Sequence, residues 1–190
     1  VRSRFEAAIE EAAAQIDLAG CRDAVIFYPS SAFFYRTSSL PFKSANKIRQ
    51  VLPLELAAAL PLDNEPFATE FSILPARDTN GSCPVFSASV PNRDLEGVLE
   101  VLEEMKIRPA VVSPVSLALF ASFLKTESHI SDFVFIDPAE EELTLILGIE
   151  RCPALVRTFN ADTPPDRFVK EMEQTVAGFR HSHNFEDRLD

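Results

Sequence analysis

Few side chains of this 190-residue chain have the types and spacing that catalysis or metal binding requires. The acidic segment at 137–142, with the sequence DPAEEE, brings four carboxylates together, and such a cluster could bind a cation. A calcium-binding loop, however, needs alternating carboxylates and a glycine, and this segment has neither. We therefore interpret Glu140–Glu142 as a solvated turn between two strands.

The histidines and cysteines offer only weak metal-binding patterns. His181 and His183 stand two residues apart, and on a helix such positions do not face each other. Cys21, Cys83 and Cys152 are far apart, odd in number and without metal-ligand spacing. We interpret the cysteines as small buried residues in a reducing compartment, without a disulfide framework.

No motif of a familiar enzyme class occurs in the sequence. The nucleophile elbow, the P-loop and the dinucleotide fingerprint are absent, and five glycines leave little material for phosphate-cradling loops. The net charge of −11 argues against a nucleic acid partner, because phosphate binding needs a basic surface. We therefore expect no catalytic residues, no cofactor-binding residues, no metal site and no cofactor.

Hydrophobic periodicity predicts helices and strands along the whole chain. An amphipathic helix over 3–17 precedes a buried strand at Ala24–Tyr28 and a second strand at Phe33–Ser39. Thr69–Leu74 and Val85–Val90 flank an Asn-Gly turn, so they predict an antiparallel hairpin. The remaining predicted elements are a strand at 110–113, a helix over 115–124, strands at 133–137, 143–149 and 155–159, and a helix that Thr163 caps.

Two further helices carry distinct signals. Ser44 is expected to cap a helix over 45–60, in which Pro53 removes a hydrogen bond and predicts a kink or a break. The helix over 93–106 has a leucine-rich face and a glutamate-rich face, and Asn92 is expected to cap it. The glutamate face predicts a solvated surface that could also meet a basic partner.

Sixteen phenylalanines and no tryptophan make up most of the aromatic content. Most of them must fill the core. Four lie around a small arm that has little core of its own, namely Phe33, Phe34, Phe42 and Phe67. An exposed subset there would form a contact surface for another protein.

Three segments, taken in order, carry a family pattern. They are 34–62, with Leu40-Pro41-Phe42 and Leu60-Pro61-Leu62 on either side of a helix, then 87–119 and 132–159. In this order they resemble the cytoplasmic part of the type II secretion system protein L family and its relatives, the protein M family of type IV pilus assembly. The resemblance covers about residues 24–180.

The resemblance implies an α+β, actin-like (ribonuclease-H-like) architecture, present here as a fragment. One lobe is expected at 1–125, with an inserted small α/β arm at about 33–77. The start of a second actin-like lobe is expected at 130–190, after the polar linker 125–131.

The resemblance also implies a non-enzymatic role. The chain is expected to be a scaffold at the cytoplasmic side of the bacterial inner membrane, which recruits the secretion ATPase through the N-terminal domain of that enzyme. Other inner-membrane platform proteins are the further partners implied. The alternative within the family is a pilus-assembly adaptor, similar to protein M, that binds the tail of a membrane protein.

An actin-like ATPase is the third hypothesis. Enzymes of that fold place Asp-x-Gly between the first two strands of the second lobe, since glycine lets backbone N–H groups approach phosphate. Here the corresponding turn begins Asp137-Pro138 and has no glycine. Its carboxylates would also repel a triphosphate, so nucleotide binding in this turn is not expected.

The ends of the chain bear on membrane attachment. No apolar run reaches the ~18–20 residues that a spanning helix needs. The sequence begins at Val1 without methionine or a signal peptide. We therefore expect a piece of a longer protein, with a membrane anchor outside the sequence, beyond Asp190.

Overall fold

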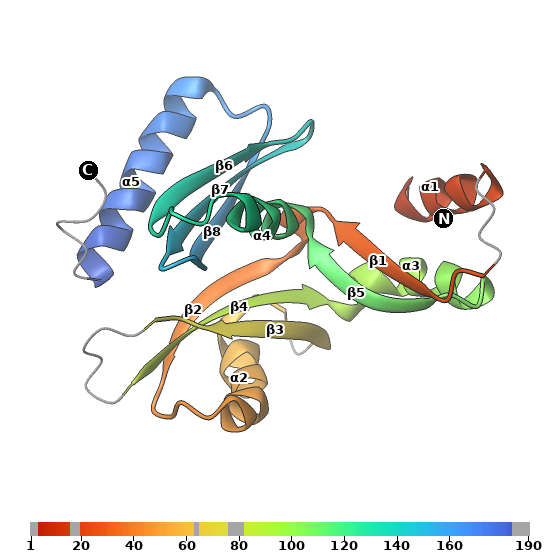
Figure 1. Cartoon of the computed structure of the whole chain (residues 1–190), viewed down its shortest axis with the longest axis horizontal. Helices are drawn as coiled ribbons and strands as arrows, with labels where there is room; N and C mark the ends of the chain where they lie inside the picture. Colours follow the sequence, from red (N-terminus) through yellow and green to blue (C-terminus); the bar gives the residue numbers. More distant parts are fainter. Residues whose placement is uncertain (1–3, 16–19, 63–64, 76–81, 184–190) are drawn as a thin grey trace.

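The computed structural model describes residues 4–15, 20–62, 65–75 and 82–183. Within these ranges the chain forms five α-helices, one short 3-10 helix and eight strands, and the strands are divided among three small sheets. Figure 1 shows the third sheet above the second, with the two-stranded sheet to one side, helix α1 at one end of the molecule and helix α5 at the other. The mixed helix and strand content agrees with the predicted α+β class.

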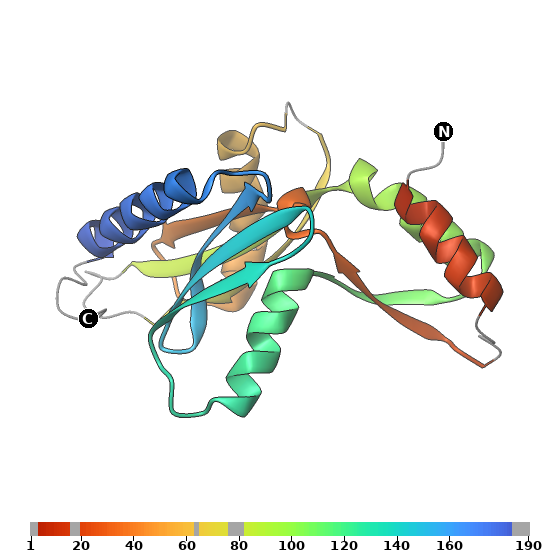
Figure 2. The same ribbon diagram turned by 90° about the horizontal axis from the view of Figure 1, so that it is seen from above.

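The first sheet consists of two parallel strands, β1 (Asp23–Tyr28) and β5 (Arg108–Pro114). Helices α1 (Arg4–Gln15) and α3 (Asn92–Glu104) lie side by side beyond it, as Figures 1 and 2 both show. The core of this part is an apolar cluster of Ile26, Val98, Leu102 and Ile107, against which Ile9 packs. The leucine-rich face predicted for α3 is therefore confirmed as its buried face.

Strand β1 is not buried on both sides, so the predicted fully buried strand is wrong. Ile26 is 7% exposed, but Val25 and Phe27 are 58% and 54% exposed on the opposite face. Val111 of the neighbouring strand is 50% exposed as well. A continuous apolar run predicts burial on both faces, whereas the described residues cover only one of them.

We call the second sheet and the helix that covers it the arm, and the insertion of an arm at about 33–77 stays a prediction. Its strands are β2 (Phe34–Leu40), β3 (Phe67–Ile73) and β4 (Cys83–Pro91), with β4 between the other two and antiparallel to both. The predicted hairpin is therefore confirmed as the β3–β4 pair. Helix α2 (Ala45–Ala59) covers one face of this sheet (Figure 1).

Helix α2 contributes most of the arm's core. Ile48, Leu52 and Leu56 stand four residues apart and are fully buried against Cys83 and Val85 of the sheet. The helix is not broken at the proline inside it, because its assignment runs on to Ala59. The turns that follow β2 and α2 are the two proline-bounded steps of the family pattern.

The third sheet is an antiparallel meander of β6 (Phe133–Pro138), β7 (Glu142–Ile149) and β8 (Cys152–Asn160). The two strands predicted at 133–137 and 143–149 are confirmed as the β6–β7 hairpin, and the third strand predicted at 155–159 lies within β8. Helices α4 (Val115–Thr126) and α5 (Pro165–His183) pack against it (Figure 2). Strand β7 lies in the middle and buries both faces.

One apolar cluster joins the arm to the third sheet. Phe86 of β4 lies in it together with Ile146, Val156 and Phe179 of the third sheet and α5. The ring of Phe120 from α4 stacks on Phe133 at 5.4 Å between ring centres. The division of the chain into lobes at about residue 125 stays a prediction.

Candidate functional site

A buried polar cluster lies where the 3-10 helix η1 (Ser30–Ala32), α4 and the third sheet meet. We call it the serine–carboxylate cluster. It occupies the place at which the family resemblance put the phosphate-binding turn. Its members are Ser30, Ser31, Ser116, Asp137 and Glu142.

Glu142 is the centre of this cluster. One carboxylate oxygen accepts the backbone N–H of Ser30 at 2.7 Å, and the other accepts the backbone N–H of Ser31 at 2.8 Å. The residue is only 7% exposed. The predicted solvated turn is therefore wrong for Glu142, although Glu140 and Glu141 are exposed as expected.

Hydroxyl groups connect η1 to the end of β6. The Ser30 and Ser116 side-chain oxygens are 2.8 Å apart, and Ser30 Oγ also accepts the backbone N–H of Ser116 at 3.0 Å. The Ser116 hydroxyl donates to the Asp137 carboxylate at 2.7 Å. Ser30 and Ser116 are both buried, so these bonds form out of contact with water.

Tyr35 closes the cluster on the side of the arm. Its hydroxyl donates to the Ser30 carbonyl at 2.9 Å. Burial raises the pKa of Tyr35 far above its ordinary value, and the nearby Glu142 carboxylate adds to this shift. The phenol therefore stays neutral.

The chemistry of this cluster is that of an anion site that is already filled. Two successive backbone N–H groups aimed at one point form a concavity that can hold phosphate or carboxylate oxygens. Here the carboxylate of Glu142 takes that position. The arrangement stabilises the contact between η1 and β7. The backbone N–H groups of Ser30 and Ser31 are already hydrogen-bonded to Glu142.

The burial of Glu142 was not predicted from the sequence, although the alternation of side chains along the strand indicates it. The side chains of a strand alternate between its two faces, so residues 142, 144 and 146 share one face. Residue 144 is fully buried, as is Ile146. Extending the predicted strand by one residue would have placed Glu142 inside rather than in the turn.

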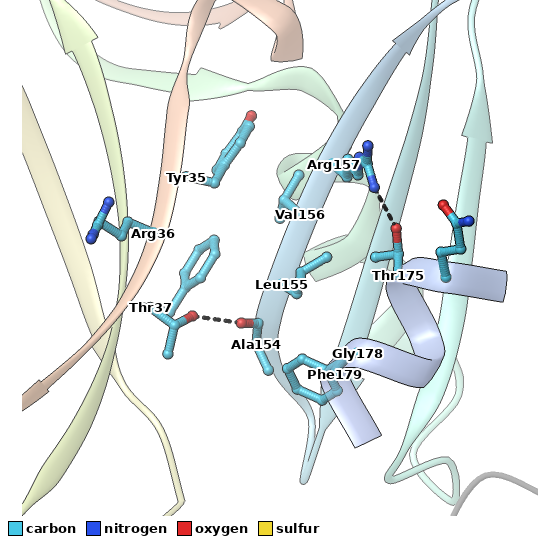
Figure 3. A pocket seen from close by; sticks show the side chains of 12 residues that line it. Tyr35, Arg36, Thr37, Ala154, Leu155, Val156, Arg157, Thr175, Gly178 and Phe179 are labelled. Atoms are coloured by element: carbon cyan, nitrogen blue, oxygen red, sulfur yellow. Dashed lines mark hydrogen bonds between the residues drawn. The ribbon is translucent and has the colours of Figure 1, made fainter. Parts of the chain in front are cut away.

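A cavity of about 460 Å³ lies between the arm and the third sheet (Figure 3). Its floor is apolar, with Tyr35 and Phe86 from the arm and Val156 and Phe179 from the other side. Arg157 stands at the rim, donating to the Thr175 hydroxyl at 2.7 Å and pairing with Glu171 at 3.0 Å. The Thr37 hydroxyl donates to the Ala154 carbonyl at 2.7 Å and bridges the two sides.

The other residues that the sequence singled out do not gather into a site. Cys21 is exposed, Cys83 is buried in the arm and Cys152 is half-buried on β8, so the interpretation of the cysteines as buried residues is wrong for Cys21. His181 and His183 lie in α5, and their side chains are outside the described part. Across the described ranges, no group of three or more histidine, cysteine, aspartate or glutamate side chains is arranged to hold a metal ion.

The predicted exposed phenylalanine surface on the arm is wrong. Phe33 is buried, Phe34 is half-buried, and Phe42 and Phe67 are half-buried against the core under α2. The large exposed apolar residues lie on β1, β5 and β6 and at single positions of the helices, and two of them, Leu54 of α2 and Ile73 of β3, belong to the arm. Among the helices that the structure describes, none is long and apolar enough to cross a membrane.

Comparisons with known proteins give a fold and no sequence family. No family model matches the chain, and no curated protein sequence matches it. Among solved structures it resembles the PilM-PilN type IV pilus biogenesis complex, with a TM-score of 0.63 and 19% identity over 90% of this chain. The chain has an actin-like fold.

A second similar structure is the cytoplasmic domain of EpsL, an inner membrane component of the type II secretion system of Vibrio cholerae. The TM-score is 0.54, with 15% identity over 82% of this chain. The chain spans 51% of the pilus protein chain and 56% of the EpsL chain, about half of each. The two proteins are the ones that the sequence pattern resembles, so the resemblance is confirmed at the level of the fold.

Proposed function

We propose that this chain is part of a scaffold on the cytoplasmic side of the bacterial inner membrane. In this proposal it belongs to a type II secretion platform and recruits the secretion ATPase by binding the N-terminal domain of that enzyme. The observation that supports the proposal is the fold, which 90% of the chain shares with a pilus assembly complex and 82% shares with a type II secretion component.

The serine–carboxylate cluster supports a non-enzymatic role. The turn that would meet a phosphate group begins with Asp137-Pro138, and Pro138 has no N–H to donate. The neighbouring N–H pair of Ser30 and Ser31 is taken by Glu142. A triphosphate would have to displace this buried carboxylate and bear its repulsion.

The pilus adaptor is the second candidate, and one observation favours it. The PilM-PilN complex resembles the chain over a larger share and with a higher TM-score than EpsL does. In that case the partner would be the tail of a membrane protein, as the sequence pattern implied. The two candidates share a mechanism, which is recognition of another protein by surface complementarity.

Titration calorimetry against two partners separates these candidates. The chain is titrated with the N-terminal domain of the secretion ATPase, and separately with the cytoplasmic tail of an inner-membrane pilus protein, both from the same genome. One-to-one binding of the ATPase domain supports the platform role, and binding of the tail alone supports the adaptor. Binding of ATP with neither protein bound would favour the ATPase hypothesis and refute the scaffold.

A further inference from the structure

The outer face of α2 is exposed, and Figure 1 shows this helix on the outside of the arm. Lys47, Leu54 and Ala58 are seven and four residues apart, so they form one stripe along the helix. The stripe lies opposite the buried stripe that Ile48 and Leu52 begin. Leu54 is 72% exposed, which is more than any other large apolar residue in the described part of the chain.

Basic residues surround the start of this helix. Lys43 stands two residues before α2, and Lys47 and Arg49 lie in its first two turns, all three exposed. The Arg49 guanidinium lies over the ring of Phe71 at 5.5 Å, at the side of the helix. Within the described ranges, none of the three basic residues has a carboxylate partner. Their charges are therefore open to a partner outside the chain.

The stability of the arm does not explain these residues. A helix carries a partial positive charge at its N-terminus, so basic residues there are unfavourable and acidic residues are favoured. Helix α2 has no acidic residue in its first turn. An apolar side chain as exposed as Leu54 gains little from the hydrophobic effect. A partner that is negatively charged at its surface and apolar beneath it would make both features favourable.

The negative charge of the chain, −11 in total, is concentrated on other elements. Glu96, Glu100 and Glu103 are four and three residues apart and form an exposed stripe on α3. Figure 1 shows α3 beside α1, away from α2. On α2 itself, Glu55 follows Leu54 and is turned by about 100° from the outer stripe. This separation of charge would orient the molecule beside a charged surface.

We propose that the outer face of α2 lies on the anionic lipid surface of the membrane. Leu54 enters the boundary between headgroups and acyl chains, while Lys43 and Lys47 stay beside the lipid phosphates. Each basic residue near an anionic membrane strengthens binding by about fivefold, so this contact is weak by itself. A weak contact is sufficient for a chain that is tethered to the same membrane, because the tether raises its effective concentration.

The inference rests on the proposed function for the location beside the inner membrane. It deepens that function by stating which face of the scaffold lies against the lipid. The acidic stripe of α3 is then directed away from the membrane surface, which would repel it.

The chain contains no tryptophan, so Leu54→Trp provides a single fluorescent reporter on this face. The variant is held by a C-terminal histidine tag on vesicles that contain nickel-chelating lipid, made of phosphatidylcholine alone or of equal parts phosphatidylcholine and phosphatidylglycerol. We expect the emission to shift to shorter wavelength, and brominated acyl chains to quench it, only where phosphatidylglycerol is present. Salt at about 0.5 M should reduce the shift, because it screens the attraction. The matched reporter Val169→Trp, at a 46% exposed position of α5, should shift on neither kind of vesicle.

Charge reversal tests the basic residues. Lys43→Glu and Lys47→Glu are combined in the Leu54→Trp chain, and the matched control combines Lys125→Glu with Lys170→Glu, at exposed positions of α4 and α5. Both pairs change the net charge equally. The first pair should abolish the shift, and the control pair should keep it, while circular dichroism checks that both chains are folded. An unshifted Leu54→Trp emission on phosphatidylglycerol, or a shift that survives the first pair, would overturn the proposal.

Calorimetry without vesicles separates this inference from the proposed function. If the emission shifts and the ATPase domain does not bind, the lipid contact stands and that partner is wrong. If the emission stays unshifted and the ATPase domain binds, the scaffold role stands and the lipid contact is wrong. If reversal of Lys43 and Lys47 abolishes binding of the ATPase domain, the outer face of α2 is the site for that enzyme, which overturns the lipid contact.

Discussion

The carboxylate of Glu142 lies 2.7 Å from the backbone nitrogen of Ser30, across 112 residues of sequence. This contact, together with the bond from Ser31, attaches the third sheet to the turn after β1. Charge-assisted bonds of this kind are about twice as strong as neutral ones, because the acceptor is ionised. Burial strengthens them further and makes an unpaired group there costly.

Replacing Glu142 by glutamine should therefore destabilise the fold. An amide has one carbonyl oxygen, so either the Ser30 or the Ser31 N–H would lose its acceptor. We expect Glu142→Gln to lower the free energy of unfolding by about 2–3 kcal/mol. Urea denaturation measures it, with Glu140→Gln in the same exposed turn as the control. Equal midpoints for the two variants would show that Glu142 contributes nothing to the junction.

Tyr35 should make the stability depend on alkaline pH. Burial raises the pKa of its phenol in the folded chain, whereas in the unfolded chain it ionises at its ordinary value of about 10. The unfolded state then loses its proton first. The stability is fully present below about pH 10 and decreases as the pH rises toward the folded pKa.

The variant Tyr35→Phe should show a shallower decrease of the unfolding free energy above about pH 10. At pH 7 it should lose about 1 kcal/mol, because the bond to the Ser30 carbonyl is gone. Denaturant titrations at pH 7 and at about pH 10.5 measure both effects. The assignment fails if the variant and the original chain lose stability equally between the two conditions.

The turn between β7 and β8 holds the end of α4 through one arginine. Glu150 and Arg151 have left-handed backbone angles, φ 45° and 67°, as a two-residue hairpin turn requires. The Arg151 guanidinium donates to the carbonyls of Leu124, Glu127 and Ile130. These carbonyls lie at the end of α4 and just after it, where they lack partners within the helix.

Arg151→Ala should lower the free energy of unfolding by about 2–3 kcal/mol, since three carbonyls lose a charged donor. It should also speed proteolysis in the 125–131 segment, while Arg22→Ala, an exposed arginine before β1, should do neither. Arg151→Lys keeps the charge and fewer donors, so its loss should be smaller. An unchanged cleavage rate in Arg151→Ala would mean that other contacts hold this segment.

Most helices and hairpins could be predicted from the sequence, because turn residues and the spacing of apolar residues determine them. The hairpin over Thr69–Leu74 and Val85–Val90 followed from its turn residues, and the helix over 93–106 from its apolar stripe. The expected cap at Asn92 was wrong, since this residue is already helical and Pro91 precedes it. Helix ends depend on one or two residues and are less well determined than helix faces.

The parts that could not be predicted depend on contacts between distant segments. The exposure of Val25 and Phe27 reflects which elements cover the β1–β5 sheet, and an apolar run does not carry that information. The cavity beside β8 arises from the placement of the arm against the third sheet, through pairs such as Thr37 and Ala154. No local sequence pattern around Thr37 or Ala154 indicates that these two segments are neighbours in the fold.

Thr144 is fully buried on β7, and among the described residues its side-chain oxygen has no hydrogen-bond partner. Thr144→Val keeps the shape and removes the unpaired group, so we expect the free energy of unfolding to rise by about 1 kcal/mol.

Thr175 is the matched control, because its buried hydroxyl accepts from Arg157 and donates to the Glu171 carbonyl. Thr175→Val should therefore destabilise the chain by about 1–2 kcal/mol, and the two changes should have opposite signs in one urea titration. If Thr144→Val destabilises as well, a buried water bonded to that hydroxyl would be the physical reason.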